Sequence, residues 1–159
     1  MKSVKQIAFA ALLTMGAFGA VTLVSCSKED DVCAVGLEGS DCKTEVRTKY
    51  VGTYKGSGSD NTGKTYTNWS TIFAVTSATP TKMTMVLADE TSAPAVSLTI
   101  TLKSNTTFDV DAYTTTDNFT YTGTGSITST QASLTLNQKD NDDTPPSTIV
   151  FTFNNMTKQ

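Results

Sequence analysis

The chain is 159 residues long, which is enough for one domain and too short for a cofactor domain with a separate substrate domain. It contains no histidine, and Arg47 is its only arginine. Without histidine, Ser-His-Asp catalysis, Cys-His catalysis and imidazole metal sites are excluded. A net charge of −3 with one arginine argues against binding to a phosphate backbone. We therefore expect no cofactor, no metal site and no nucleic-acid partner.

A targeting segment opens the chain. Lys2 and Lys5 precede an apolar stretch over residues 7–24, which ends in Leu23-Val24-Ser25-Cys26. A basic start, a short apolar stretch and small residues before a cleavage point are typical of a secretory signal. A retained transmembrane anchor is the alternative, because the apolar stretch is about long enough to span a bilayer.

The end of this stretch, Leu23-Val24-Ser25-Cys26, resembles the lipobox of bacterial lipoproteins. The resemblance implies that residues 1–25 are a signal peptide and that Cys26 is lipidated as the first residue of the mature chain. Each acyl methylene buried in a bilayer contributes about 0.8 kcal/mol, so several chains on Cys26 would hold the protein at a membrane. Lys2 and Lys5 leave with the signal, so ten basic residues remain against 15 acidic ones, a net charge of −5.

A charged run follows Cys26 and consists of Lys28, Glu29, Asp30 and Asp31. It resembles the acidic export tag behind the lipidated cysteine in surface lipoproteins of Bacteroidota. This resemblance implies an outer membrane protein that is exposed at the cell surface. A solvated spacer is the alternative, because charged runs near chain termini commonly have that role.

Two further cysteines, Cys33 and Cys42, lie in residues 26–48, which we interpret as a lipidated tether. A secreted context favours a disulfide between them. Gly36 and Gly39 lie between the two cysteines and allow the chain to reverse. Closing a loop of about ten residues would stabilise the fold by roughly 2.5 to 3 kcal/mol. A redox or metal pair is the alternative, but the spacing is not that of a CxxC motif.

From Lys49 onward the apolar residues recur with a period of two, which predicts strands with one buried face. The clearest case is residues 96–103, where Val, Leu, Ile and Leu alternate with Ser, Thr, Thr and Lys. Threonine makes up about a fifth of the chain and suits strands with a solvated face. The pattern predicts eight strands, over about 49–57, 65–77, 82–88, 95–103, 107–115, 118–128, 132–139 and 147–156.

Most of the connections between these strands are two to seven residues long, and they are rich in residues that favour turns. Short connections join antiparallel neighbours by hairpins and leave little room for long crossovers. The sequence therefore predicts an all-β domain over residues 49–159, an antiparallel up-and-down eight-stranded meander closed into a barrel. A two-sheet β-sandwich is the alternative.

The first predicted strand carries Tyr50-Val51-Gly52-Thr53-Tyr54. Followed by an eight-stranded meander, this segment resembles the small lipocalin-like and avidin-like barrels of Bacteroidota surface lipoproteins. The resemblance covers about residues 49–159 and implies a pocket for a small molecule, although many small barrels fill their lumen with side chains.

Glycines at every second position of two strands leave space inside such a barrel. They are Gly52, Gly56 and Gly58 on the first strand and Gly123 and Gly125 on the sixth. A ligand in that space would stack on Tyr54, Trp69 or Tyr121, which are the candidate ligand-binding residues. The alternative is structural, with the space taken by rings from Phe73, Phe151 or Phe153.

Three weaker patterns remain. Asp109 and Asp111 share a strand face with Tyr113, and paired carboxylates can hydrolyse glycosides, but Phe108 and Val110 should occupy the core and leave both aspartates outside. The loop 140–143 offers three carboxylates to a cation such as Ca²⁺, without the glycine and distal glutamate of an EF-hand. Asn68, Asn105, Asn118 and Asn155 each begin a glycosylation sequon, which we interpret as chance matches in an Asn- and Thr-rich chain.

The sequence thus favours a surface-anchored lipoprotein with a non-enzymatic binding barrel. Its partners would be the membrane, through Cys26, and either a small apolar or sugar ligand or an extracellular macromolecule. One alternative is a structural or envelope-interaction lipoprotein with a filled barrel. The other is a hydrolase that uses Asp109 and Asp111.

Overall fold

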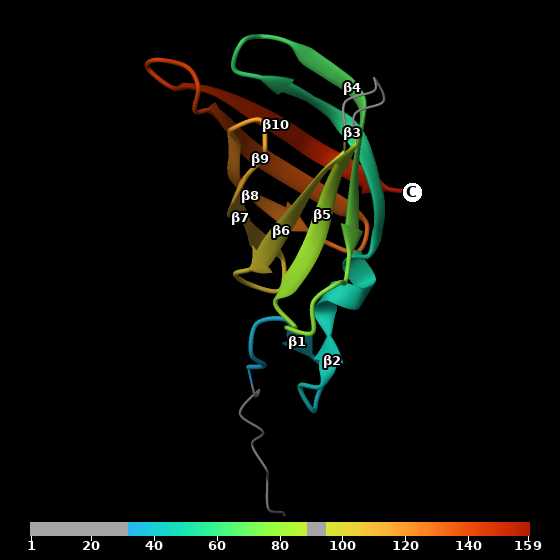
Figure 1. Ribbon diagram of the computed structural model, residues 1–159. Coiled ribbons are helices and arrows are strands. Elements are labelled where there is room, and N and C mark those ends of the chain that lie inside the picture. The colour runs from blue at the N-terminus through green and yellow to red at the C-terminus, as the bar shows by residue number, and fades with distance from the viewer. Residues whose placement is uncertain (1–31, 89–94) are drawn as a thin grey trace, which may run out of the picture. The chain divides into compact units, whose positions relative to one another are not determined.

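The computed structural model of the protein describes residues 32–88 and 95–159, which belong to one compact unit, Asp31–Gln159. Figure 1 shows this unit as a barrel of strands. The unit holds the barrel, its core and the disulfide described below, so we expect it to fold as an independent domain. No helix within the described residues is long and apolar enough to cross a membrane.

The described residues of the unit form eight long strands and three short elements. The short elements are β1 (Leu37–Glu38), β2 (Thr44–Glu45) and the 3-10 helix η1 (Val46–Tyr50). The long strands are β3 (Gly52–Asp60), β4 (Thr65–Ala74), β5 (Lys82–Ala88), β6 (Val96–Leu102), β7 (Thr107–Thr114), β8 (Phe119–Ile127), β9 (Gln131–Asp140) and β10 (Ser147–Lys158).

The eight long strands form a closed antiparallel barrel in which each strand pairs with its neighbours in the sequence. The last strand, β10, pairs with the first, β3, through Phe153 opposite Gly58 and Thr152 opposite Ser59. This pairing closes the sheet, so the predicted up-and-down barrel is confirmed and the two-sheet sandwich is excluded. All eight predicted strands are present, and their predicted ends are within three residues of the observed ones.

The largest difference lies at the first strand, which begins at Gly52 and not at Lys49. Residues Val46–Tyr50 form η1 instead, a helix that the period-two pattern did not predict. Val46 and Tyr50 are buried, so one face of this short helix belongs to the core. The packed unit therefore includes part of the segment 26–48 that the sequence suggested to be a tether.

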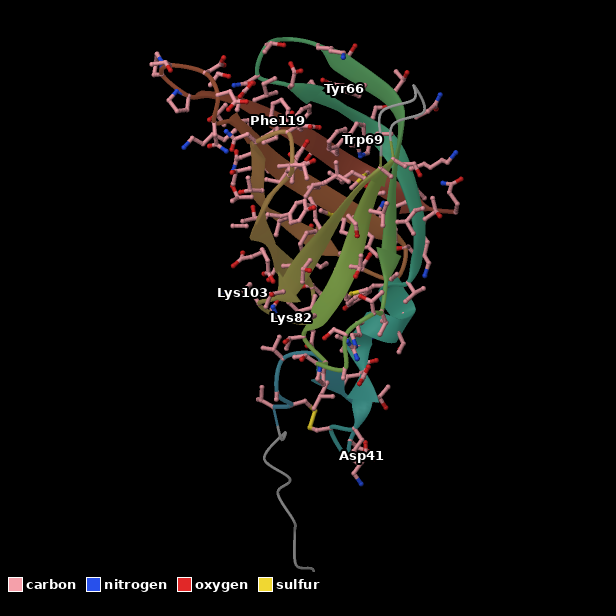
Figure 2. The ribbon with its side chains drawn as sticks, viewed as in Figure 1. Asp41, Tyr66, Trp69, Lys82, Lys103 and Phe119 are labelled. Atoms are coloured by element: carbon pink, nitrogen blue, oxygen red, sulfur yellow. A yellow bond between two sulfur atoms is a disulfide. The ribbon has the colours of Figure 1, made fainter. Side chains whose placement is uncertain are left out.

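The barrel has two different ends, which Figure 2 shows through its labelled residues. At the closed end lie the turns 75–81, 103–106 and 128–130, near Lys82 and Lys103. At the mouth end lie the turns 61–64, 115–118 and 141–146, near Tyr66 and Phe119. Residues 32–51 enter the barrel at the closed end, because β3 starts there.

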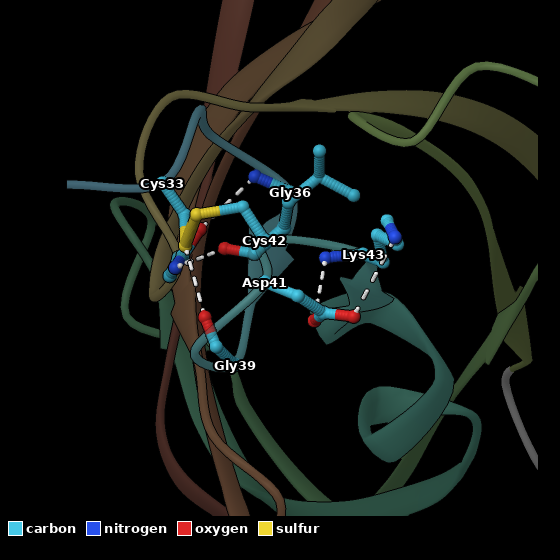
Figure 3. Close-up of a disulfide and its surroundings, with 8 residues drawn as sticks. Cys33, Gly36, Gly39, Asp41, Cys42 and Lys43 are labelled. Atoms are coloured by element: carbon cyan, nitrogen blue, oxygen red, sulfur yellow. Dashed lines mark hydrogen bonds and ion pairs between the residues drawn. A yellow bond between two sulfur atoms is a disulfide. The ribbon is translucent and has the colours of Figure 1, made fainter. Parts of the chain in front are cut away.

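A small disulfide-linked hairpin precedes the barrel (Figure 3). Cys33 and Cys42 are bonded, with their Cα atoms 5.2 Å apart, which confirms the predicted pairing. Gly36 and Gly39 both have φ of +89°, a conformation that favours glycine, so these residues make the predicted chain reversal. The hairpin contacts the barrel through Asn105, whose side chain accepts from the Gly36 amide at 3.0 Å and donates to the Leu37 carbonyl at 3.2 Å.

The buried guanidinium of Arg47 fastens η1 to the closed end. Its Nη1 donates to the carbonyl oxygens of Ser77, Thr79 and Lys82 at 2.7, 2.6 and 2.8 Å, and its Nε donates to Glu45 at 2.8 Å. Only 3% of the residue is exposed. A planar guanidinium can serve several acceptors at once, so this one side chain organises the turn between β4 and β5.

The part of the lumen nearer the closed end is filled by apolar side chains, which alternate with outward-facing polar ones along the strands. On β6, Leu98, Ile100 and Leu102 are buried while Ser97 and Thr99 are exposed. Of the predicted rings, Phe153 occupies the space beside Gly58; the ring beside Gly125 is Phe108, and the space beside Gly56 is taken by Met156. An added Cβ would lie 2.3 Å from the Phe153 ring at Gly58 and 2.3 Å from the Phe108 ring at Gly125.

Three register shifts interrupt the alternation and turn additional side chains inward. In β4, Trp69 pairs with Gly56 and Tyr66 pairs with Gly58, with Asn68 between them at φ +59°. In β10, Phe153 and Met156 both face the lumen, with Asn155 at φ +56°. The third shift, in β7, shapes the mouth end and is described below.

The asparagines of the four sequons have structural roles. Asn68, Asn118 and Asn155 adopt positive φ, which asparagine tolerates better than most residues, at two bulges and one turn. Asn105 binds the N-terminal hairpin.

Replacement of Arg47 should destabilise the protein. Arg47→Ala removes the four hydrogen bonds of the buried guanidinium, which we expect to lower the free energy of unfolding by roughly 1–3 kcal/mol or more. Arg47→Lys should recover only part of this loss, because an ammonium lacks the planar fork. Urea unfolding followed by circular dichroism measures both.

The matched control is Lys49→Ala on the same helix, which removes an exposed ion pair with Glu38 and should cost less than about 1 kcal/mol. Equal stability of the Arg47→Ala and Lys49→Ala proteins would contradict the role given to Arg47.

Candidate functional site

The mouth end of the barrel contains a pocket of about 460 Å³, a volume typical of small-ligand sites. Strands β6, β7, β8 and β9 and the turn 115–118 surround it. We call it the mouth pocket and define it by ten residues: Ala95, Val96, Ser97, Tyr113, Thr115, Thr116, Asp117, Phe119, Tyr121 and Gln138.

Tyr113 reaches this pocket because of the register shift in β7. Val110 pairs with Gly123 and Tyr113 pairs with Tyr121, so between these pairs two residues of β7 oppose one of β8. Residues paired across a ladder point to the same face, and Tyr113 therefore lies on the inner side with Tyr121. The prediction that Tyr113 shares the outer face with Asp109 and Asp111 is wrong, because strict alternation fails at a bulge.

Tyr121 is almost fully buried and supplies a polar group to the pocket. Its hydroxyl accepts a hydrogen bond from Nε2 of Gln138 at 2.9 Å. Burial raises the pKa of Tyr121, so its hydroxyl stays protonated well above neutral pH. The phenol proton and the side-chain carbonyl oxygen of Gln138 take no part in this bond, so both can bind a ligand.

The three predicted ligand-binding residues lie in different places. Tyr121 lines the mouth pocket. Tyr54 is fully buried at the closed end, where its hydroxyl donates to the Thr128 carbonyl at 2.9 Å and its ring packs edge-on against Phe73. Burial raises the pKa of Tyr54 to about 12. Tyr54 is therefore a residue of the filled core and does not line the pocket.

Trp69 belongs to an aromatic cluster near the mouth end with Tyr66, Phe151 and Phe153. Its ring stacks on Phe153 at a centroid distance of 4.5 Å and meets Tyr66 edge-on at 5.7 Å. Its indole nitrogen donates to the buried hydroxyl of Thr71 at 3.1 Å. The half-buried indole is thus held by neighbouring rings, as the structural interpretation predicted for this space.

The aspartates of the hydrolase hypothesis are each paired with a lysine on the outer face. Asp109 lies 3.5 Å from Lys103, and Asp111 lies 2.9 Å from Lys82. Partial burial raises the pKa of Asp111, but hydrogen bonds from Lys82 and Thr101 outweigh it, so the pKa lies below its ordinary value. A general acid needs a raised pKa, so this arrangement does not favour the paired-carboxylate mechanism.

Carboxylate oxygens of the acidic loop 140–143 accept hydrogen bonds from other groups of the protein. Oδ1 of Asp140 accepts from the Asp142 amide at 2.9 Å, and Oδ1 of Asp142 accepts from the Asn118 side chain at 2.5 Å. Among residues 32–88 and 95–159, no group of three or more His, Cys, Asp or Glu side chains could hold a metal ion.

A larger hollow of about 560 Å³ lies across the outer surface of β7, β8 and β9. Its polar lining consists largely of serine and threonine side chains with the Lys103–Asp109 ion pair, and its aromatic contribution is the edge of Phe108. These two charges already satisfy each other. We therefore regard the mouth pocket, which offers three aromatic rings, as the better candidate site.

The sequence did not single out Tyr113, Phe119 or Gln138 as site residues. Phe119 could have been found, because it shares the two-residue period of Tyr121 on β8. Tyr113 could not, since nothing in the pattern marks the bulge. Cys26, Lys28, Glu29, Asp30 and Asp31 lie outside the described residues.

Comparisons with known proteins give structural likeness but no family. No protein family and no curated protein matches the chain. A crystal structure of a "putative outer membrane protein" from Bacteroides fragilis is similar, with 17% identity and a TM-score of 0.44. The match covers 69% of this chain and 52% of that one, so this chain spans about half its length.

Asp60, at the turn beside the aromatic cluster, should make the free energy of unfolding depend on pH in the acidic range. It accepts hydrogen bonds from Thr62, Lys64 and Tyr66, and these bonds, the Thr62 hydroxyl first, lower its pKa from 3.8 to about 2. Because the folded-state pKa is depressed, the stabilisation is present above about pH 3.8 and is lost as pH falls towards 2.

We expect the Asp60→Asn protein to lose less stability than the wild type between pH 5 and pH 2, as measured by urea unfolding at each pH. Asp143→Asn, at an exposed turn residue with no hydrogen bond among the described residues, is the control and should behave as the wild type. Parallel curves for all three proteins would contradict the assignment.

Proposed function

We propose that this protein is an outer membrane lipoprotein, anchored through Cys26, whose surface-exposed barrel binds a ligand in the mouth pocket without catalysing a reaction. The observation that carries this proposal is a pocket of ligand size at the barrel end opposite the end where residues 32–51 enter.

The position of the pocket suits a tethered binding protein. Residues 32–51 join the barrel at the closed end, where Gly36 binds Asn105 and Arg47 binds the turn 75–81. The eight residues of β7 separate this end from the turn at Thr115, which corresponds to roughly 25 Å of extended strand. Residues 32–51 therefore join the barrel at the end opposite the pocket.

The outer surface of the barrel supports attachment by lipid rather than by the barrel itself. Barrels that span a membrane carry an apolar band outside and polar residues inside. Here the order is reversed: Leu98 and Ile100 face inward, and Ser97 and Thr99 face outward. This polarity suits a domain in water that is held at the membrane by acyl chains on Cys26.

A non-enzymatic role is part of the proposal. The chain lacks histidine, and the paired aspartates Asp109 and Asp111 each face a lysine outside the barrel. The pocket itself offers aromatic rings, hydroxyls and an amide, which are groups that bind and orient a ligand.

A second candidate is an envelope-interaction protein that recognises a macromolecule on its outer face. Two observations favour it. Apolar side chains fill the part of the lumen nearer the closed end, and a hollow lies over the outer surface of β7, β8 and β9. It ranks second because that hollow lacks exposed aromatic anchors, which carry most of the binding energy at protein interfaces.

The anchoring is tested in cells by Cys26→Ser. Without the thiol we expect loss of labelling by radioactive palmitate, accumulation of the longer unprocessed chain and loss of cell-surface protease sensitivity. Neutralising Lys28, Glu29, Asp30 and Asp31 should keep palmitate labelling but remove surface exposure. The control replaces both Cys33 and Cys42 by serine and should keep the label. Palmitate incorporation into the Cys26→Ser protein would contradict lipidation at that residue.

Ligand binding is tested with residues 27–159 and a panel of neutral oligosaccharides, palmitate and an uncharged aromatic dye. Tyr113→Ala removes an exposed ring of the mouth pocket, with 46% exposure, so it should weaken binding at least tenfold without unfolding the barrel. Ile72→Ala, a 38% exposed site on the outer face of β4, is the matched control and should bind as the wild type. Titration calorimetry measures the affinity of each variant. Equal affinities of the two variants would contradict the assignment of the mouth pocket as the binding site.

A further inference from the structure

The lining of the mouth pocket limits the chemistry of its ligand. Five of its ten residues are polar without an aromatic ring: Ser97, Thr115, Thr116, Asp117 and Gln138. Three are aromatic: Tyr113, Phe119 and Tyr121. A ligand that fills this space must present an apolar face to the rings and several hydrogen-bonding groups to the other side chains.

The charge of the pocket disfavours an anion. Asp117 is the one charged side chain among the ten described residues that line it. A ligand carboxylate, sulfate or phosphate would meet this carboxylate with no lysine or arginine in the lining to compensate. The pocket therefore disfavours an anion, and the Asp117 carboxylate can accept hydrogen bonds from ligand hydroxyls.

The floor of the pocket is polar as well. The Gln138 amide donates to the Tyr121 hydroxyl at 2.9 Å, which leaves the phenol proton as a donor and the Gln138 carbonyl oxygen as an acceptor. A purely apolar ligand would cover both groups without replacing their hydrogen bonds to water, which is unfavourable. Groups of this kind select a ligand that carries hydroxyls.

From these observations we propose that the mouth pocket binds an uncharged saccharide, with one sugar face against Phe119 and Tyr113 and its hydroxyls bonded to Tyr121, Gln138 and Asp117. This proposal rests on the proposed binding function and names the ligand class. A pyranose has the required combination, since its C–H face is apolar and its rim carries both donors and acceptors.

The experiment uses residues 27–159 and calorimetric titration with neutral oligosaccharides, an oligosaccharide of uronic acids, and palmitate. The informative variant is Tyr121→Phe, which keeps the ring and the packing but removes the hydroxyl. Loss of one such bond, about 1 kcal/mol, predicts a roughly fivefold weaker affinity for the neutral saccharide that binds best.

Tyr54→Phe is the matched control. It removes the buried hydroxyl that donates to Thr128 at the closed end, away from the pocket, and should leave saccharide affinity unchanged although it lowers stability. A thermal melt of each variant separates loss of fold from loss of binding. Weaker saccharide binding by Tyr121→Phe alone would support the inference.

The other outcomes overturn it. Binding of palmitate that Tyr113→Ala weakens, without saccharide binding, would replace the saccharide by an apolar ligand and leave the proposed function standing. Equal affinity for the uronic acid and neutral oligosaccharides would overturn the exclusion of anions. Absence of binding by every probe would overturn both the saccharide and the binding function of the mouth pocket.

Discussion

Backbone pairing between β3 and β10 is the constraint on which the other features depend. It joins the two ends of the meander, so eight strands enclose a lumen and leave no barrel strand with an unpaired edge. A lumen of eight strands has room for side chains and little more, which makes the size of each inward residue decisive. Gly58 and Gly125 are small because the rings of Phe153 and Phe108 occupy the adjacent space.

The two ends of the barrel differ, because one is sealed and the other contains a pocket. The closed end is sealed by η1, which Arg47 binds to three carbonyl groups, and by the buried side chains of Val46 and Tyr50. The mouth end carries half-buried aromatic rings, among them Phe119, and contains the mouth pocket. Residues 32–51 thus join the barrel at its sealed end, and the pocket lies at the opposite end.

Bulges give this barrel side chains that strict alternation would not supply. At three places two inward residues stand three positions apart, as with Tyr66 and Trp69 on β4 and Val110 and Tyr113 on β7. Each extra residue adds a ring or a methionine to the inner face, and two of the bulges contain an asparagine with positive φ. The aromatic content of the mouth end therefore depends on local backbone irregularity as much as on composition.

The sequence by itself determined the fold class, the eight strands and the disulfide. Period-two patterns and short turns are local signals, and the pairing Cys33–Cys42 followed once the lipobox resemblance had set Cys26 aside. Only the tertiary structure decided which tyrosine is core and which lines a pocket: Tyr54 and Tyr121 look alike in the pattern, yet Tyr54 is fully buried at the closed end and Tyr121 lines the mouth pocket. The reason is that position along the barrel axis and the face turned by a bulge depend on pairing between distant residues, which the period of a single strand does not encode.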